Sequence, residues 1–277
     1  MLTNVEGFDD SVYNIHCCED NTQNFMKQEL TSYGNSDMLN RSNIHIPCNY
    51  MYTNENMSKT LSKINKSDSS NNYVSWYPHC FNIGYKNKLW SMLRNHYDIN
   101  EAATIMPMSY DMPKDYSALM SSHNPNKSYI LKKNCHMQKG LEVTTNINKV
   151  ANYRDDGYIV AQDMIDVYRF DHNGKDLTFN LRIYYLIYTL NGQTYHYTHD
   201  DGIISYSSDG GHIASFYNKD LYEKGLPITT KKFKDNILPE LDWETIDKKI
   251  TQNIFKIGKA FNKKYMSDLQ LLDRVNY

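Results

Sequence analysis

Lys132 is the first candidate in this sequence for chemistry on an anion. It ends the apolar run YILK at residues 129–132. A strand there would hold the ammonium rigidly, as a point charge for a phosphate group. The polar residues that follow, with Gly140 before the next apolar run, would suit a loop that covers phosphates. The alternative for Lys132 is a surface lysine at the end of a strand.

Arg182 is the second candidate. Arg182 and Asn180 alternate with Phe179 and Leu181, so the two polar side chains share the opposite face of a predicted strand. A charged group within so apolar a strand carries a desolvation cost unless it is paired. Arg182 is therefore either the partner of a carboxylate in the core or part of a cleft that binds an anion.

Potential metal ligands are present, but their spacing is poor. His199, Asp200 and Asp201 end a predicted hairpin strand, where neighbouring side chains point in opposite directions, so we expect a solvated turn. The histidines and cysteines of the N-terminal third match no zinc pattern; they are His16, Cys17, Cys18, His45, Cys48, His79 and Cys80. No metal ligand is assigned. Nucleophile-elbow, P-loop, metalloprotease and kinase motifs are absent as well.

Composition excludes several classes of protein. The 277 residues carry 30 Lys and Arg against 32 Asp and Glu, which does not favour a nucleic-acid partner. No apolar stretch is long enough to cross a membrane. The 24 Tyr and 9 Phe supply enough burial capacity to exclude global disorder. Five Cys without a CxxC pair indicate a reducing compartment, so we expect a cytoplasmic protein.

Hydrophobic periodicity predicts the elements that would position these side chains. Helices are predicted over residues 87–97, 114–121 and 243–261, the last with Asp242 as N-cap. Strands are predicted over residues 129–132, 141–145, 158–161, 177–190, 193–199 and 203–207. Asn191-Gly192 is a hairpin signal, and residues 59–72 form a Ser/Asn/Lys linker. This order predicts an α+β fold with mainly antiparallel sheets and flanking helices.

The order of seven segments resembles the tubulin–tyrosine ligase-like family of the ATP-grasp superfamily. The segments are GYKNKLWSML at 84–93, MPMSYDMPKDY at 106–116, YILKK at 129–133, QKGLEV at 138–143, VAQDMID at 160–166, TFNLRIYYL at 178–186 and YHYTHDDGIISY at 195–206. They resemble the family patterns Kd-Lw-nl, P-tf-lP-dy, I-K-P, G-GI, VVQ-YIE, KFDLR-Y-L and YLY-dGl-RF. The resemblance covers about residues 76–207. It implies a central ATP-grasp domain at 73–170 and an incomplete C-terminal domain at 171–277, after a polar segment or small module at 1–72.

The resemblance also implies an activity. The family uses ATP to activate a carboxylate as an acyl phosphate, which the amine of an amino acid then attacks. The expected partners are tubulin or another acidic protein tail and an amino acid, and the expected cofactors are ATP and Mg²⁺. The implied ligands of ATP are Lys132 at the α/β phosphates, Gln138, Lys139 and Gly140 in the covering loop, Gln162 and Met164 beside adenine, and Asn180. Arg182 is the implied catalytic residue, near the γ-phosphate and the acyl phosphate.

Several positions depart from the family patterns. Thr178 replaces a lysine, Asn180 an aspartate, Ser205 an arginine and Lys133 a proline. The chain ends at Tyr277, before the Asp…Glu-x-Asn motif in which the family has its metal ligands, so we expect the last strands of the C-terminal domain to be missing. A lone chain is expected to be a weak ligase or none. The alternatives are a ligase completed by another polypeptide, a catalytically dead module that binds tubulin or another protein, and the remnant of a longer gene.

Overall fold

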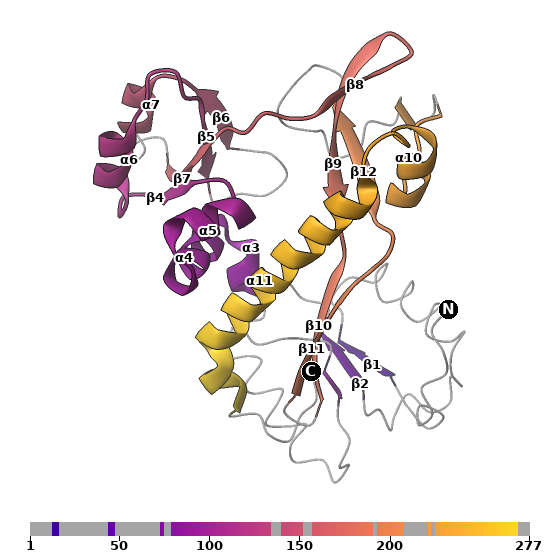
Figure 1. Cartoon of the computed structure of the whole chain (residues 1–277). Coiled ribbons are helices and arrows are strands. Elements are labelled where there is room, and N and C mark those ends of the chain that lie inside the picture. The colour runs from indigo at the N-terminus through magenta and orange to yellow at the C-terminus, as the bar shows by residue number, and fades with distance from the viewer. Residues whose placement is uncertain are drawn as a thin grey trace. The chain divides into compact units, whose positions relative to one another are not determined.

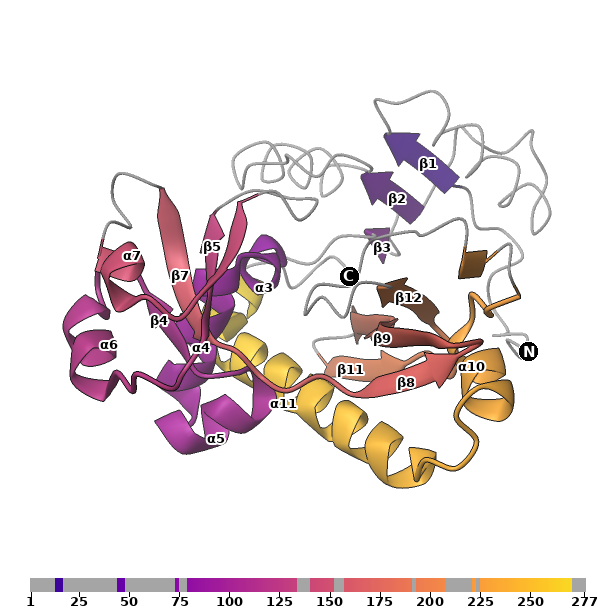
Figure 2. The same ribbon diagram turned by 90° about the horizontal axis from the view of Figure 1, so that it is seen from above.

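The structure is a computed structural model (Figures 1 and 2). Its residues fall into two compact units. It describes residues 13–16, 44–47, 73–74, 79–133, 140–151, 157–190, 193–207, 221–222 and 225–270. The first unit comprises Met1–Cys80, Ile187–Tyr195 and Lys264–Tyr277, and the second Phe81–Leu186 and His196–Lys263. The predicted linker at 59–72 and the Asn191-Gly192 turn lie outside the described residues.

The first unit contains a parallel sheet of three short strands. They are β1 (Tyr13–His16), β2 (Ile44–Pro47) and β3 (Tyr73–Val74), in the order β1-β2-β3. Sequence analysis predicted no strand here. Parallel strands are joined by long connections and not by hairpin turns. The turn residues of a hairpin, which are the strongest local signal for a pair of strands, are therefore missing from this segment. This sheet is also the exception to the expected antiparallel pairing.

The first sheet of the second unit has the strand order β4-β7-β5-β6, and all its neighbours are antiparallel. Its strands are β4 (Ser109–Asp111), β5 (Tyr129–Lys133), β6 (Leu141–Thr144) and β7 (Tyr158–Asp163). One face carries the buried Tyr129, Leu131 and Ala161. Leu119 of α6 (Tyr116–Ser122) and Val150 of α7 (Ile147–Ala151) join them in one hydrophobic cluster.

Three helices precede this sheet along the chain: α3 (Phe81–Gly84), α4 (Lys86–His96) and α5 (Ile99–Ile105). The helix predicted at 87–97 is α4, whose buried face carries Trp90, Met92 and Leu93. Sequence analysis did not predict α5, which begins after the N-cap Asp98. The Asp98 carboxylate accepts from the backbone N–H groups of Asn100 and Glu101, each at 2.9 Å.

The second sheet of the unit has the order β12-β9-β8 and is also antiparallel. Its strands are β8 (Arg169–His172), β9 (Lys175–Arg182) and β12 (Ile203–Ser207). Leu177 and Ile204 are fully buried on its apolar side, in one cluster with Phe233 of α10 (Thr230–Asn236). Sequence analysis did not predict the short elements β4, β8, α3, α7 and α10.

The predicted single strand at 177–190 is wrong. Ile183 and Tyr184 interrupt it, so β9 ends at Arg182 and β10 (Tyr185–Leu190) begins a separate two-stranded sheet with β11 (Gln193–Thr198). The two halves pair with different partners, β8 and β12 for one and β11 for the other. Apolar and aromatic residues continue through the break, so the local sequence does not reveal it.

The helix that ends the described chain is α11 (Trp243–Gln270), longer than the predicted 243–261. Its N-cap is Asp242 as predicted, since the carboxylate accepts from the backbone N–H of Thr245 at 3.1 Å. No helix among the described residues is long and apolar enough to cross a membrane. The whole is a mixed α+β structure.

The base of the β10–β11 hairpin contacts α11 within the second unit. The His196 ring lies 2.5 Å from the Tyr185 hydroxyl through Nδ1 and 3.2 Å from the Asn262 amide through Nε2. A Cβ atom on Gly258 would overlap the Tyr185 hydroxyl and approach His196 ring atoms to 3.1 Å. Burial lowers the pKa of His196. Glycine at 258 therefore allows the hairpin base to approach the helix closely.

Candidate functional site

Lys132 lies on the face of the β4-β7-β5-β6 sheet opposite the hydrophobic cluster. In the register of β5 and β7, Ile130 pairs with Gln162 and Lys132 with Val160, so these four side chains share one face. The ammonium of Lys132 donates to the side-chain Oε1 of Gln162. Lys132 thus lies on a strand, as predicted. The neutral amide of Gln162, on the neighbouring strand β7, orients its ammonium group.

The Gln162 amide is itself fixed by β4 and the residues before it. Its Nε2 donates to the Ser109 hydroxyl at 2.7 Å and to the backbone carbonyl of Pro107 at 3.3 Å. Gln162 and Ser109 are buried and pair directly across β4 and β7. Both N–H bonds of the amide are therefore used within the protein, and the Oε1 atom is left to face Lys132.

A second lysine lies near the first. Lys86, the first residue of α4, is close enough to Lys132 to lower its pKa by repulsion. The first turn of α4 has no acidic residue, and its N-cap residue, Tyr85, makes no side-chain capping bond. Two ammonium groups therefore lie near the positive end of a helix dipole. Sequence analysis missed Lys86, although its motif contains a lysine at this position.

Two polar contacts hold α4 against the sheet. Arg94 forms an ion pair with the buried carboxylate of Asp115 at 2.9 Å. Near the other end of the helix, the Asn87 amide donates to Asp111 at 3.4 Å. These contacts, with the buried Trp90, fix the start of α4 relative to β4. Lys86 is thereby held near β5.

Burial and the neighbouring Lys86 lower the pKa of Lys132 to about 8, burial being the larger cause. No carboxylate contacts its ammonium in the described part of the chain. A largely buried charge whose hydrogen-bond partner is a neutral amide is costly to keep, and an anion would compensate it. The site is therefore electrostatically prepared for a group such as phosphate.

The other predicted ATP ligands fall at several places. Gly140 lies in the turn before β6, with φ of 71°, and its carbonyl accepts from the backbone N–H of Lys133 at 2.9 Å. Met164 directly follows β7, and its backbone N–H donates to the carbonyl of Ser128 at 2.9 Å. Gln138 and Lys139 lie outside the described residues. Lys132, Gly140, Gln162 and Met164 thus lie on or beside three neighbouring strands of one sheet.

Asn180 and Arg182 belong to the other sheet of the unit, β12-β9-β8. As predicted, both alternate with the core residues of β9, and both are exposed. Asn180 pairs with Ser205 across β9 and β12, and Arg182 pairs with Ile203. The face that they share is mostly polar and includes the buried Thr178 and Ser207. Arg182 is therefore displayed at a sheet surface, not enclosed in the core.

The end of β9 at Arg182 is packed tightly against Gly202. A Cβ atom on Gly202 would overlap the backbone carbonyl of Arg182 and lie 3.3 Å from Cγ2 of Thr230. The Gly202 N–H donates to the Thr230 hydroxyl at 2.7 Å, and its carbonyl accepts from the Thr230 N–H at 3.1 Å. Gly202 is therefore part of the packing that positions Arg182.

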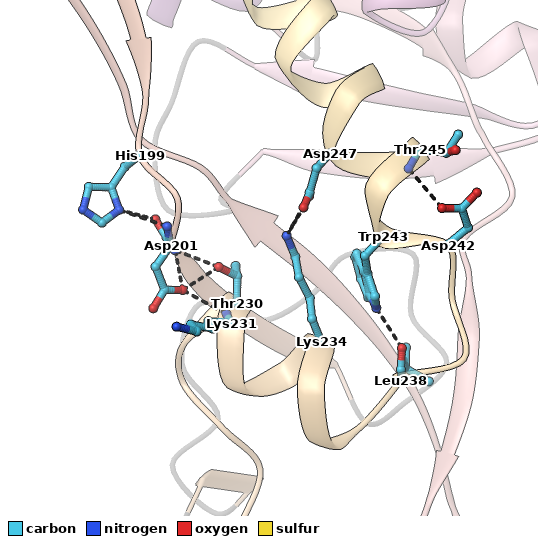
Figure 3. Close-up of polar contacts among 11 residues, drawn as sticks. His199, Asp201, Thr230, Lys231, Lys234, Leu238, Asp242, Trp243, Thr245 and Asp247 are labelled. Atoms are coloured by element: carbon cyan, nitrogen blue, oxygen red, sulfur yellow. Dashed lines mark hydrogen bonds and ion pairs between the residues drawn. The ribbon is translucent and has the colours of Figure 1, made fainter.

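Asp201 ties this region to the start of α10 (Figure 3). Its Oδ1 accepts from the Thr230 hydroxyl at 2.6 Å, from the Lys231 N–H at 2.9 Å and from the Gly202 N–H at 2.8 Å. These bonds lower the pKa of Asp201 to about 2, the bond from Thr230 being the largest cause. His199 contacts the Asp201 backbone through Nδ1. Asp201 therefore binds the first turn of α10, alongside the N-cap residue Thr229.

No metal ligands are assigned. Within the described ranges, no group of three His, Cys, Asp or Glu side chains gathers as a metal site would require. Oδ1 of Asp201 already accepts from three donors. Of the histidines and cysteines that match no zinc pattern, only His79 and Cys80 have described side chains. The described residues thus do not fit Mg²⁺, and no chemical step is derived through it.

Comparison with known proteins gives one match. A family model described as "Tubulin-tyrosine ligase family" matches residues 62–222, more than half of the chain. The match includes Lys132, Gln162, Arg182 and Gly202. A search of curated proteins found no matching relative.

Proposed function

Because the chain belongs to the tubulin-tyrosine ligase family, we propose that it binds ATP beside Lys132 and ligates an amino acid to a carboxylate of an acidic protein tail. Membership implies an ATP-grasp fold and ATP-dependent ligation of an amino acid to a tubulin-like substrate. The observation that carries the proposal is the Lys132 ammonium, which is largely buried, bound by a neutral amide and close to a second lysine.

The physical argument is one of charge compensation. Without an anion, the folded protein bears the desolvation cost of the Lys132 ammonium and its repulsion from Lys86. A phosphate group would offset both. With a pKa of about 8, Lys132 is mostly protonated at neutral pH and needs no further activation to bind an anion.

The proposed reaction has two steps. An oxygen of the protein carboxylate attacks the γ-phosphorus of ATP, and ADP leaves. The amine of the amino acid then attacks the acyl phosphate, releasing inorganic phosphate and a proton and forming the amide. We place Arg182 beside the transferred phosphoryl group, since such transfer depends on positioning and charge stabilisation. We place the reaction in the cytoplasm.

Calorimetric titration with ATP tests the site assignment. Lys132→Met and Arg182→Ala should each weaken binding by about 10- to 150-fold, since a charge-assisted contact contributes ~1.5–3 kcal/mol. Matched controls are Lys114→Met and Lys248→Ala, which remove exposed charges outside the site and should leave the affinity unchanged. Unchanged affinity in both site variants, or equal losses in the controls, would contradict the assignment.

A nucleotide-binding module without ligase activity is the second candidate. Thr178 and Asn180 favour it, because both are neutral where the family pattern has Lys and Asp, and both lie on the polar face with Arg182. Incorporation of labelled Tyr, Glu or Gly into tubulin tail peptides separates the two. ATP binding without incorporation would support the module, whereas incorporation that Arg182→Ala abolishes would support the ligase.

A further inference from the structure

Ser109 of β4 lies beside Gln162 of β7, on the face of the sheet that carries Lys132. Ser109 and Gln162 pair directly across the two strands, and their exposed fractions are 2% and 5%. Bulk water therefore cannot satisfy their polar atoms, and each has to find its hydrogen-bond partners within the protein. Those partners decide which way the Gln162 amide faces.

The Ser109 hydroxyl can act only as an acceptor toward Gln162. Its single hydrogen is donated to the backbone carbonyl of Pro107 at 2.7 Å. The Ser109 oxygen then accepts from Nε2 of Gln162 at 2.7 Å, and the Pro107 carbonyl accepts from the same Nε2 at 3.3 Å. Both hydrogens of the amide are thus directed at acceptors that have no hydrogen left to give, and the bond to Ser109 is the shorter of the two.

The opposite end of the amide faces a group that can only donate. The Lys132 ammonium has no lone pair, and it donates to Oε1 of Gln162. A reversed amide would place Nε2 against the ammonium and Oε1 against the Pro107 carbonyl, so two attractive contacts would become repulsive. The hydrogen bonds therefore run in one direction, from the ammonium through the amide to the Ser109 hydroxyl.

The backbone holds Ser109 in place for this contact. Before it, the carbonyl of Met108 accepts from the backbone N–H of Asp163 at 2.8 Å, and after it the backbone N–H of Met112 donates to the carbonyl of Ile159 at 2.9 Å. These bonds join the chain around β4 to β7 at both ends. The Ser109 hydroxyl is therefore fixed relative to the amide by the pairing of the strands.

We propose that Ser109 is a positioning residue of the nucleotide site, whose hydroxyl holds the Gln162 amide in the orientation that presents Oε1 to the Lys132 ammonium. This role rests on the proposed function, since it affects ligand binding only where a phosphate group lies beside Lys132. Ser109 needs no contact with the nucleotide. It acts through Gln162, and this distinguishes it from a residue that only stabilises the sheet.

Removal of the hydroxyl has a defined consequence for Lys132. In Ser109→Ala, Nε2 of Gln162 keeps only the longer bond to Pro107, so the amide is free to turn its NH₂ group toward the ammonium. Lys132 then loses its acceptor, while its burial and the repulsion from Lys86 remain. The pKa of Lys132 should therefore fall further, and its charge should be less available to an anion.

The charged groups near Lys132 in the described part of the chain are set by the packing of α4. Lys86 approaches from α4 and lowers the pKa of Lys132 by repulsion. Asp111 of β4 shares this face of the sheet and accepts from the Asn87 amide of α4 at 3.4 Å. Substitution of Ser109 leaves both groups in place, so a change in the pKa of Lys132 reports on the amide.

¹³C NMR of protein labelled at lysine Cε tests the proposal without nucleotide. The Lys132 signal, assigned by its loss in Lys132→Met, should titrate at lower pH in Ser109→Ala than in the wild type. Ser109→Thr, which retains the hydroxyl, should restore the wild-type pKa. Thr144→Val is the matched control, because it removes a buried hydroxyl of the same sheet that accepts from the Asn146 N–H at 3.0 Å. An unchanged Lys132 pKa in Ser109→Ala, or an equal fall in the control, would overturn the proposal.

A second substitution shows whether Ser109 acts through the amide. Gln162→Met removes the acceptor of Lys132 and should lower its pKa at least as far as Ser109→Ala does. Adding Ser109→Ala to Gln162→Met should then lower it no further, because the group that transmits the effect is absent. A further fall of similar size would contradict the role of Ser109. Where Ser109→Ala does not fold, Ser109→Cys, with its weaker acceptor, should give a smaller fall in the same direction.

Calorimetric titration with ATP connects this role with binding. Ser109→Ala should weaken binding by about 2- to 10-fold, the range that one neutral hydrogen bond supplies. The loss should grow as the pH rises from about 7 to about 8, because fewer molecules keep the ammonium charge. Ser109→Thr and Thr144→Val should bind ATP as the wild type does.

The two measurements separate this role from the proposed function. If the NMR result is as expected but the wild type binds no ATP, the proposed function fails while the orienting of Lys132 by Ser109 stands. If the wild type binds ATP and Ser109→Ala leaves both the Lys132 pKa and the affinity unchanged, the positioning role alone fails.

Discussion

The backbone carbonyl of Arg182 occupies the space that a Cβ atom on Gly202 would need. Gly202→Ala should therefore push β12 away from the end of β9, where Arg182 and Ile203 pair. We expect a loss of about 1–3 kcal/mol in the free energy of unfolding, the usual cost of overpacking. Urea denaturation measures it. Gly84→Ala is the matched control, because no atom lies within 4 Å of its Cβ position. An equal loss of stability in both variants would show that the loss comes from restricted backbone freedom and not from a steric overlap at residue 202.

The buried Lys132 predicts how stability depends on alkaline pH. Its pKa falls from 10.5 in the unfolded chain to about 8 in the folded protein, so the unfolded state binds more protons between these values. The free energy of unfolding should rise across this window by about 2–3 kcal/mol more in the wild type than in Lys132→Met. Lys127→Met is the control. The ion pair with Asp163 raises the pKa of Lys127, so its removal should not abolish the rise.

The hairpin base predicts a response to acid. Burial lowers the pKa of His196 below 6.5, so the folded state resists its protonation. Stability from this contact is present above pH 6.5 and is lost as the pH falls through the lowered value. The protection factors of the β10 and β11 amides against hydrogen exchange should fall over that range in the wild type and change less in His196→Gln. His96→Gln, on α4, should leave the hairpin response intact; the opposite pattern would argue against His196.

Asp201 predicts a second acid effect, at lower pH. Asp201→Ala should lose about 1–2 kcal/mol of unfolding free energy at pH 7, comparable to removal of a helix cap. Because the folded pKa is about 2 against 3.8 for an ordinary aspartate, this contribution should vanish as the pH falls through these values. Asp200→Ala, at the exposed neighbouring position, should have little effect at either pH. Equal losses of stability at the two positions would show that the contact of Asp201 with the start of α10 is not the cause.

Local patterns were sufficient for much of the fold. The apolar spacing of residues 87–97 predicted α4 within one residue at each end, and Asp242 was identified as the N-cap of α11. The break at Ile183 and Tyr184 was missed because apolar and aromatic residues continue on both sides of it. The chain changes its pairing strands at this point. Which strands pair depends on the tertiary fold, so a short stretch of sequence does not contain that information.

The candidate site was only partly predictable, for a related reason. Lys132 was identified because it ends an apolar strand, which would hold its ammonium rigidly. The contact of Lys132 with Gln162 depends on the register of β5 and β7, and the approach of Lys86 depends on how α4 packs on the sheet. Arg182 was recognised as a member of a polar face, whereas the exposure of that face depends on how β9 packs in the folded chain.

The lowered pKa of Lys132 links nucleotide binding at the proposed site to the uptake of a proton from the solvent. At pH 8 only about half of the molecules carry the ammonium charge, whereas an anion beside it holds nearly all of them in the charged form. Nucleotide binding would then take up about half a proton per molecule at that pH. The heat of binding would depend on the ionisation enthalpy of the buffer, and affinity would decline as the solution becomes more alkaline. If Lys132 holds phosphate as proposed, it also couples nucleotide binding to the pH of the solution.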